Sequence, residues 1–240
     1  MKRYFLIAIL TIALLPSCRL MSRNSVRGDG NVVNQTRNIS NFSGVEAGGA
    51  VDVYLSTDSG YSVRVEADQN LQEYIEVYLD GGTLRIRNAN NTSVEPSRPI
   101  KVYVSAPNLE KLGASGASNI YGSGKITTSR EMDIDLSGAS RIRAEIKSPR
   151  VTVEMSGACS AELKGETRDL SIEASGSSDL KAFDLLAENV DIDISGAGSV
   201  EVYASVKLNA GASGASNIRY KGTASVSTDI SGAGSVKKAE

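Results

Sequence analysis

The sequence predicts an all-β fold, a β-solenoid whose coils are about 18–22 residues long. The first observation is a tetrapeptide, Ser-Gly-(Ala/Ser)-(Ser/Gly/Cys), which occurs seven times at intervals of 22, 19, 19, 20, 18 and 18 residues. The second is the pattern before each copy, where apolar and polar residues alternate as in a half-buried strand. The third is the unit length, because so short a unit cannot bury its own apolar row, whereas stacked coils can. The tetrapeptides begin at Ser115, Ser137, Ser156, Ser175, Ser195, Ser213 and Ser231.

Residues 1–17 have the features of a signal peptide. Lys2 and Arg3 precede an apolar run that ends at Leu15 and is about half as long as a membrane-spanning helix requires. The following Pro16-Ser17-Cys18 completes a sequence that resembles the lipobox of bacterial lipoproteins, in which the Cys is lipidated and becomes the mature N-terminus. We therefore expect an exported protein anchored to a membrane through Cys18. An ordinary cleaved signal peptide is the alternative.

Three further regions follow in order. Residues 18–37 are polar and show no periodicity, which predicts a flexible tether. Residues 38–110 contain short alternating runs separated by turn signals, so we expect an N-terminal β region that starts the solenoid and caps it. Within that region, residues 48–51 resemble a degenerate first copy of the corner. Residues 111–240 carry the repeat, in which each unit is a strand, a tight corner, a second strand and a short return.

The composition excludes several classes of function. The chain has no His, which rules out Ser-His-Asp and Cys-His catalysis and the zinc sites that need His. A net charge of −2 without a basic stripe argues against a nucleic-acid partner. Cys159 is the only other Cys, so lipidation of Cys18 leaves no intramolecular disulfide.

A β-propeller with two units per blade is the structural alternative to the solenoid.

Several motifs succeed one another in a characteristic order: Phe42-Ser43-Gly44-Val45, residues 48–53, Tyr61-Ser62-Val63, Ala67-Asp68, Gly82-Thr83-Leu84, Pro107-Asn108-Leu109 and the repeat. In this order they resemble the auto-transporter adhesin "head GIN" domain family, found in exported proteins of Bacteroidetes-type bacteria. The resemblance covers the chain from about Asn38 to its C-terminus and implies a single-stranded, right-handed β-helix with an adhesive role and no catalytic residues. Residues 19–23 lack the acidic side chains that typically follow the lipid-bearing Cys of surface-exported members. Both faces of the outer membrane, periplasmic and external, therefore stay open for this expected lipoprotein.

One column of aligned side chains is acidic. Two residues before the Ser of four successive coils stand Asp135, Glu154, Glu173 and Asp193. Like charges about 5 Å apart repel by about 0.8 kcal/mol in water, so the column favours a divalent cation or a cationic ligand, calcium first. The alternative is a solvated acidic face that discourages aggregation. The sequence lacks the glycine-aspartate repeat of calcium β-rolls. This absence favours the solvated acidic face over a calcium site and predicts no bound cofactor.

Two other columns carry candidate contacts. Six residues after each Ser the middle coils alternate in charge, which predicts cross-strand ion pairs on a structural surface. These residues are Arg143, Glu162, Lys181, Glu201 and Arg219. An aromatic ladder of Phe183, Tyr203 and Tyr220 is expected to bind sugar rings or to cover an apolar edge, and the scarcity of aromatic residues favours the second.

These features predict a non-enzymatic, lipid-anchored protein of the cell envelope, an adhesin or a binding module for an extended glycan or protein partner. One alternative is a polysaccharide-active enzyme, with Asp133 and Asp135 or Asp191 and Asp193 as the acid and base. Another is an architectural role in which a partner strand adds to the last coil. The sequence does not determine the oligomeric state.

Overall fold

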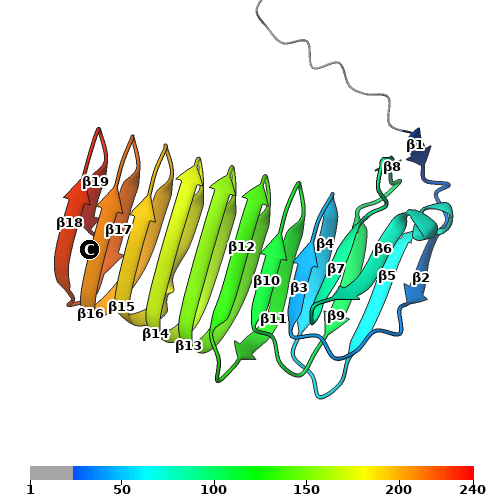
Figure 1. Cartoon of the computed structure of the whole chain (residues 1–240), viewed down its shortest axis with the longest axis horizontal. Helices are drawn as coiled ribbons and strands as arrows, with labels where there is room; N and C mark the ends of the chain where they lie inside the picture. The colour runs from blue at the N-terminus through cyan, green and yellow to red at the C-terminus, as the bar shows by residue number, and fades with distance from the viewer. Residues whose placement is uncertain (1–23) are drawn as a thin grey trace, which may run out of the picture.

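The structure, a computed structural model, describes residues 24–240. It is nearly all β and forms a solenoid of about seven turns, so the predicted fold class is confirmed (Figure 1). The predicted signal peptide and Cys18 lie outside the described residues. Within residues 24–240, no helix has the length and apolar character needed to cross a membrane.

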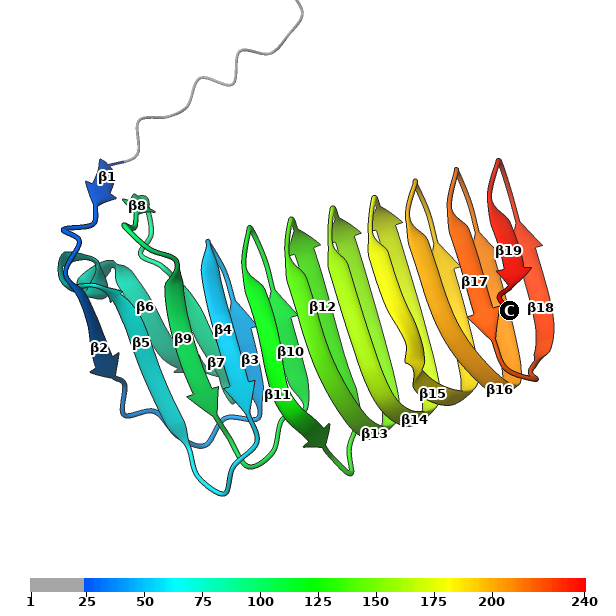
Figure 2. The same cartoon turned by 180° about the vertical axis from the view of Figure 1, so that it is seen from behind.

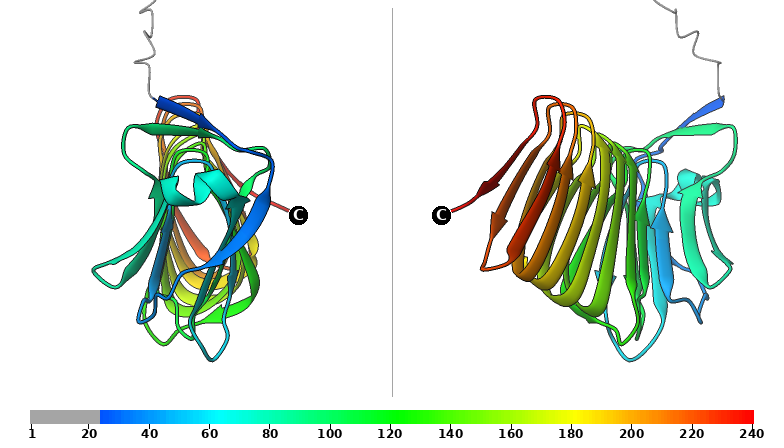
Figure 3. Two further views of the ribbon diagram at one scale, coloured as in Figure 1. Left: turned by 90° about the vertical axis from the view of Figure 1, so that its right-hand side faces the viewer. Right: turned by 60° about the vertical axis from the view of Figure 1, so that its left-hand side comes forward.

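Two sheets face each other across the core, and each coil of the repeat adds a strand to both (Figure 3). The longest strands bend and pass through both sheets: β13 (Arg141–Gly157), β14 (Ser160–Gly176), β15 (Asp179–Ile194) and β16 (Ser199–Ala212). Their C-terminal halves lie in sheet I, which precedes the glycine corners. Their N-terminal halves lie in sheet II, which follows the corners.

Sheet I runs in the order β6 (Ile75–Asp80), β7 (Thr83–Asn88), β3 (Gly44–Ala47), β10 (Lys111–Ala114), β12 (Met132–Gly138), the C-terminal halves of β13 to β16, and β18 (Ser225–Ile230). Sheet II runs in the order β2 (Val32–Thr36), β5 (Ser62–Asp68), β9 (Ile100–Ser105), β4 (Val51–Ser56), β11 (Asn119–Thr127), the N-terminal halves of β13 to β16, β17 (Asn217–Lys221) and β19 (Ser235–Lys238). All these pairings are parallel except β2–β5, β5–β9 and β6–β7.

The alternation within each strand builds the core. Val151, Val153 and Met155 of β13 are buried between the sheets, and the polar residues between them face outward. Every coil repeats this arrangement, so the buried side chains form one continuous hydrophobic core. The packing of coil on coil therefore replaces the core that a single unit cannot make.

The glycine corners lie directly over one another, as predicted. Gly138, Gly157 and Gly176 have φ values of 75°, 104° and 81°, in the left-handed region that favours glycine. From Gly49 to Gly214, the carbonyl oxygen of each corner glycine accepts a hydrogen bond of 2.7–2.8 Å from a backbone N–H one coil later. Gly49 is thus the first corner, and the seven tetrapeptides follow it along one axis.

The N-terminal end is capped. Beyond the parallel coils, β5 pairs antiparallel with both β9 and β2, while β6 and β7 form a hairpin on the other sheet. The 3-10 helix η1 (Gln69–Tyr74) closes this end, with Leu71 fully buried (Figures 2 and 3). At the opposite end, all six residues of β18 are exposed.

The prediction of a flexible tether extending to residue 37 is wrong for its described part. Strand β1 (Asn24–Arg27) pairs with β8 (Thr92–Glu95), and β2 joins sheet II. The connection between β1 and β2 is held by Asp68, whose carboxylate accepts a hydrogen bond of 2.9 Å from the Gly30 N–H. This long-range contact has no periodicity that would reveal it in the sequence.

Candidate functional site

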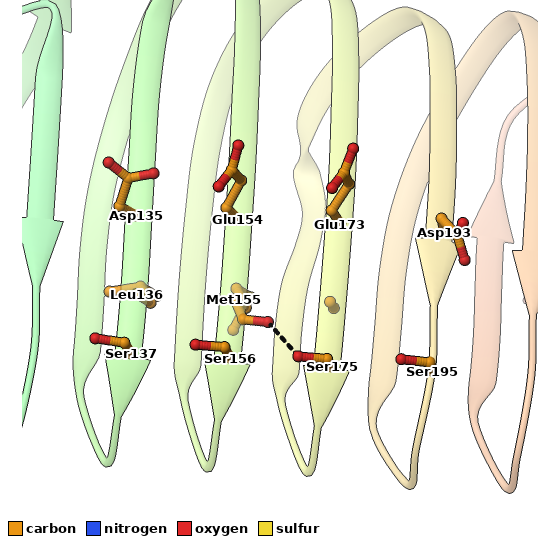
Figure 4. A pocket seen from close by; sticks show the side chains of 11 residues that line it. Asp135, Leu136, Ser137, Glu154, Met155, Ser156, Glu173, Ser175, Asp193 and Ser195 are labelled. Atoms are coloured by element: carbon orange, nitrogen blue, oxygen red, sulfur yellow. Dashed lines mark hydrogen bonds between the residues drawn. The ribbon is translucent and has the colours of Figure 1, made fainter.

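The four carboxylates of the acidic column lie side by side on the outer face of sheet I. Asp135 pairs in register with Glu154, Glu154 with Glu173, and Glu173 with Asp193, so the predicted alignment is confirmed (Figure 4). Next to them run Ser137, Ser156, Ser175 and Ser195, the first residues of the corners. Together these side chains line an open groove of about 730 Å³, which we call the acidic groove.

The charges in the groove are unevenly compensated. Lys111 lies 3.1 Å from both Glu46 and Asp135, and its hydrogen bonds to these carboxylates raise the pKa of the Lys111 ammonium. Within residues 24–240, Glu154, Glu173 and Asp193 take part in no ion pair. The negative potential is therefore concentrated at the last three positions of the column.

Asp133 lies on the same strand face as Asp135. Burial raises the pKa of the Asp133 carboxyl, and the negative charges of Glu131 and Asp135 raise it further. A raised carboxyl pKa is a feature of general acids, but it is also the ordinary result of adjacent like charges.

The acidic column does not form a preformed calcium site. In the described part of the chain, no three acidic, Cys or His side chains are grouped so that they could hold one ion. Each coil contributes a single carboxylate to a straight row, whereas calcium takes six to eight oxygen ligands around one point.

The alternating column on sheet II forms two of the predicted ion pairs. Arg143 lies 2.9 Å from Glu162, and Arg219 lies 2.7 Å from Glu201. Lys181 is in register between the two glutamates. Opposite charges on neighbouring strands stabilise the stack and leave less free charge for a ligand.

The predicted aromatic ladder is wrong. The register shifts between Ala182 and Leu186, so Tyr203 pairs with Leu186 instead of Phe183. Tyr220 pairs with Val202 in an inward-facing row and packs against the core. The expected line of three rings rests on equal spacing, which the irregularity in β15 breaks.

A different aromatic ladder lies at the N-terminal end of sheet II. The Tyr54 ring stacks on the Tyr103 ring, with centroids 5.3 Å apart, and packs at a tilt against the Tyr121 ring, with centroids 5.4 Å apart. The Arg64 guanidinium lies 4.0 Å from the centre of the Tyr103 ring. Burial raises the pKa of the Tyr54 hydroxyl, and the charge of Asp52 adds to this effect. The signal for this ladder was a Tyr at the same place in the alternating runs of the three strands.

Comparison with known proteins identifies the family of the sequence and solved structures with the same fold. The family model described as "Putative auto-transporter adhesin, head GIN domain" matches residues 41–224. Comparison with curated proteins gives no match.

Solved structures share the architecture. A putative adhesin from Bacteroides fragilis superposes with a TM-score of 0.83 at 19% identity, covering 89% of this chain and 100% of that one. A protein described as a putative lipid binding protein, from Parabacteroides distasonis, superposes with a TM-score of 0.73 at 24% identity, covering 90% of this chain and 100% of that one. A putative adhesin from Parabacteroides merdae gives 0.71 at 20%, with the same coverage of 90% and 100%. At these identities the likeness shows the fold. The family itself is shown by the model match, which spans most of the chain: the protein belongs to the head GIN domain family of putative auto-transporter adhesins.

Proposed function

We propose that the protein is a non-enzymatic binding module of the cell envelope, which holds an extended partner along the acidic groove. The partner is a glycan chain or a protein segment. Lipidation at Cys18 would attach the module to the outer membrane, as the lipobox-like sequence before that residue suggests. The family name and the solved relatives described as adhesins support a role in binding.

The observation that carries the proposal is the regular spacing of carboxylates and serines along the groove over four coils. Each coil offers one carboxylate and one serine hydroxyl at the spacing of paired strands, about 4.8 Å. A catalytic cleft needs one place that differs from its surroundings, whereas equal groups at equal intervals suit a partner that runs along the solenoid axis. Since Glu154, Glu173 and Asp193 have no counter-charge among the described residues, their oxygens are available to accept hydrogen bonds from a partner.

Arrays of extended glycans and of synthetic peptides, probed with the mature protein, test the proposal. We expect the triple variant Glu154→Gln, Glu173→Gln, Asp193→Asn to lose at least tenfold in binding to the recognised class, because it removes the acceptors along the groove. The matched control is Glu73→Gln, Asp184→Asn, Glu188→Gln, which removes the same charge from exposed carboxylates outside the groove. The proposal fails if the control loses as much binding as the triple variant, or if neither array is bound.

A further inference from the structure

A second concave surface lies on the edge of the solenoid opposite the glycine corners. It is a pocket of about 500 Å³ at the turns between sheets. The β4–β5 loop and the β11–β12 turn, which lie beside it, are at the lower edge of the solenoid in Figure 2. Four parts of the chain line it: residues 41–43, Tyr61, Asn108 with Glu110, and residues 127–130. None of these residues belongs to the acidic groove. We call it the Tyr61 pocket.

An aromatic ring is fixed in this pocket. Tyr61 is 38% exposed, and its ring packs edge to face on Phe42 with centroids 5.0 Å apart. Phe42 is itself buried in the core, so the exposed ring rests on a rigid support. The turn before Tyr61 is held by the Ser105 hydroxyl, which lies within hydrogen-bond distance of the Gly60 carbonyl and the Asp58 carboxylate.

Free amide groups stand near this ring. Among residues 24–240, the side chains of Asn41 and Asn108 take part in no hydrogen bond, so both keep their donors and acceptors for a ligand. Asn41 has a φ of 62°, a left-handed conformation that Asn tolerates better than most residues. Glu110 and Arg130 lie 3.5 Å apart and leave little net charge in the pocket.

We propose that the Tyr61 pocket binds a sugar ring. A sugar combines an apolar face of C–H groups, which packs on an aromatic ring, with a rim of hydroxyls that both donate and accept hydrogen bonds. Tyr61 supplies the first contact, and the amides of Asn41 and Asn108 supply the second. The volume falls within the range of small-ligand sites.

The same features disfavour other ligands. A phosphate group would need an uncompensated cation, and Arg130 faces Glu110. An acyl chain would need an apolar lining, whereas Asn, Ser, Thr, Glu and Arg side chains dominate here. An extended peptide would add to a free strand edge, and the pocket is built from turns.

Saturation-transfer NMR with the mature protein tests this site, using a panel of neutral hexoses, N-acetylhexosamines and uronic acids. We expect at least one sugar to receive saturation from the wild type. Tyr61→Ala should weaken that binding at least tenfold and Asn108→Ala should weaken it several-fold. Tyr61→Phe should retain most of it, because the ring and its support remain.

Two controls separate this site from other surfaces. Tyr54→Ala removes a tyrosine of similar exposure, 36%, from the ladder on sheet II and should leave sugar binding unchanged. The triple variant of the acidic groove should also leave it unchanged, so failure of one proposal does not imply failure of the other. The inference is overturned if no sugar in the panel binds, or if Tyr61→Ala, shown to be folded by its circular dichroism, binds as the wild type does.

Discussion

Asp68 shows how a single side chain organises the N-terminal cap. Its carboxylate is fully buried, and it accepts hydrogen bonds from the backbone N–H groups of Gly30 and Ser97, both at 2.9 Å, and from the Ser97 hydroxyl at 2.5 Å. These contacts tie the β1–β2 connection and the segment before β9 to strand β5. Burial alone would raise the pKa of Asp68, but the hydrogen bonds from Ser97 and Gly30 outweigh it and hold the pKa below its usual value.

We expect Asp68→Asn to lower the free energy of unfolding by about 1–3 kcal/mol near neutral pH, because an amide cannot accept all three hydrogen bonds. A lowered native pKa stabilises the fold above the ordinary Asp pKa of about 3.9, and this contribution is lost as the pH falls through the native value. The gap between wild type and variant should therefore narrow in acid. Urea unfolding at neutral and acidic pH measures it, with the exposed Asp184→Asn as control. A gap that is absent at neutral pH, or that widens in acid, would contradict this account.

At the scale of the corner, three of the four tetrapeptide residues have separate tasks. The first Ser borders the acidic groove in four coils, and the Gly supplies the left-handed backbone. The fourth residue points inward and is buried: the Ser178 hydroxyl donates to the Ser175 carbonyl at 2.9 Å, and Cys159 occupies the same place in its coil. The position needs a small side chain that fits beneath the corner, which explains why Ser, Cys and Gly all occur there.

The stacked corners leave no room for a Cβ atom at the glycine position. A Cβ on Gly157 would lie 2.6 Å from the carbonyl oxygen of Gly138, which itself accepts a hydrogen bond from the next coil. We expect Gly157→Ala to destabilise the protein by at least about 1–3 kcal/mol from the backbone conformation alone, with a further loss from the displaced corner. Gly60→Ala is the control, since a Cβ there meets nothing within 4 Å. Chemical denaturation measures the free energy of unfolding of both variants. If Gly157→Ala is as stable as Gly60→Ala, the corners can shift to accommodate a Cβ atom.

Across the whole molecule, the accuracy of the sequence-based prediction depends on regular spacing. The corners and the columns beside them were predictable because each step of 18–22 residues returns the chain to the same place one coil later. The Phe183 ladder failed where β15 departs from that spacing. The Tyr54 ladder and the Tyr61 pocket have no regular spacing in the sequence, because the N-terminal coils include hairpins and residues such as Tyr54 and Tyr103 become neighbours at an irregular separation.

The two faces of the rod also differ in how charge is distributed, and this difference can be measured without a ligand. Glu173 stands between two other carboxylates on sheet I, whereas Glu162 stands between Arg143 and Lys181 on sheet II. Like charges on adjacent strands repel and opposite charges attract, each by a few tenths of a kcal/mol up to about 1 kcal/mol at exposed positions.

We therefore expect Glu173→Gln to raise the free energy of unfolding slightly and Glu162→Gln to lower it, although both remove one negative charge. Salt at about 1 M, where the screening length is about 3 Å, should bring the two variants together. Thermal unfolding at low and high salt measures both effects. If the two substitutions shift stability in the same direction at low salt, the net charge of the protein matters more than its arrangement in columns. The acidic face would then impose no local repulsion that a bound partner could relieve.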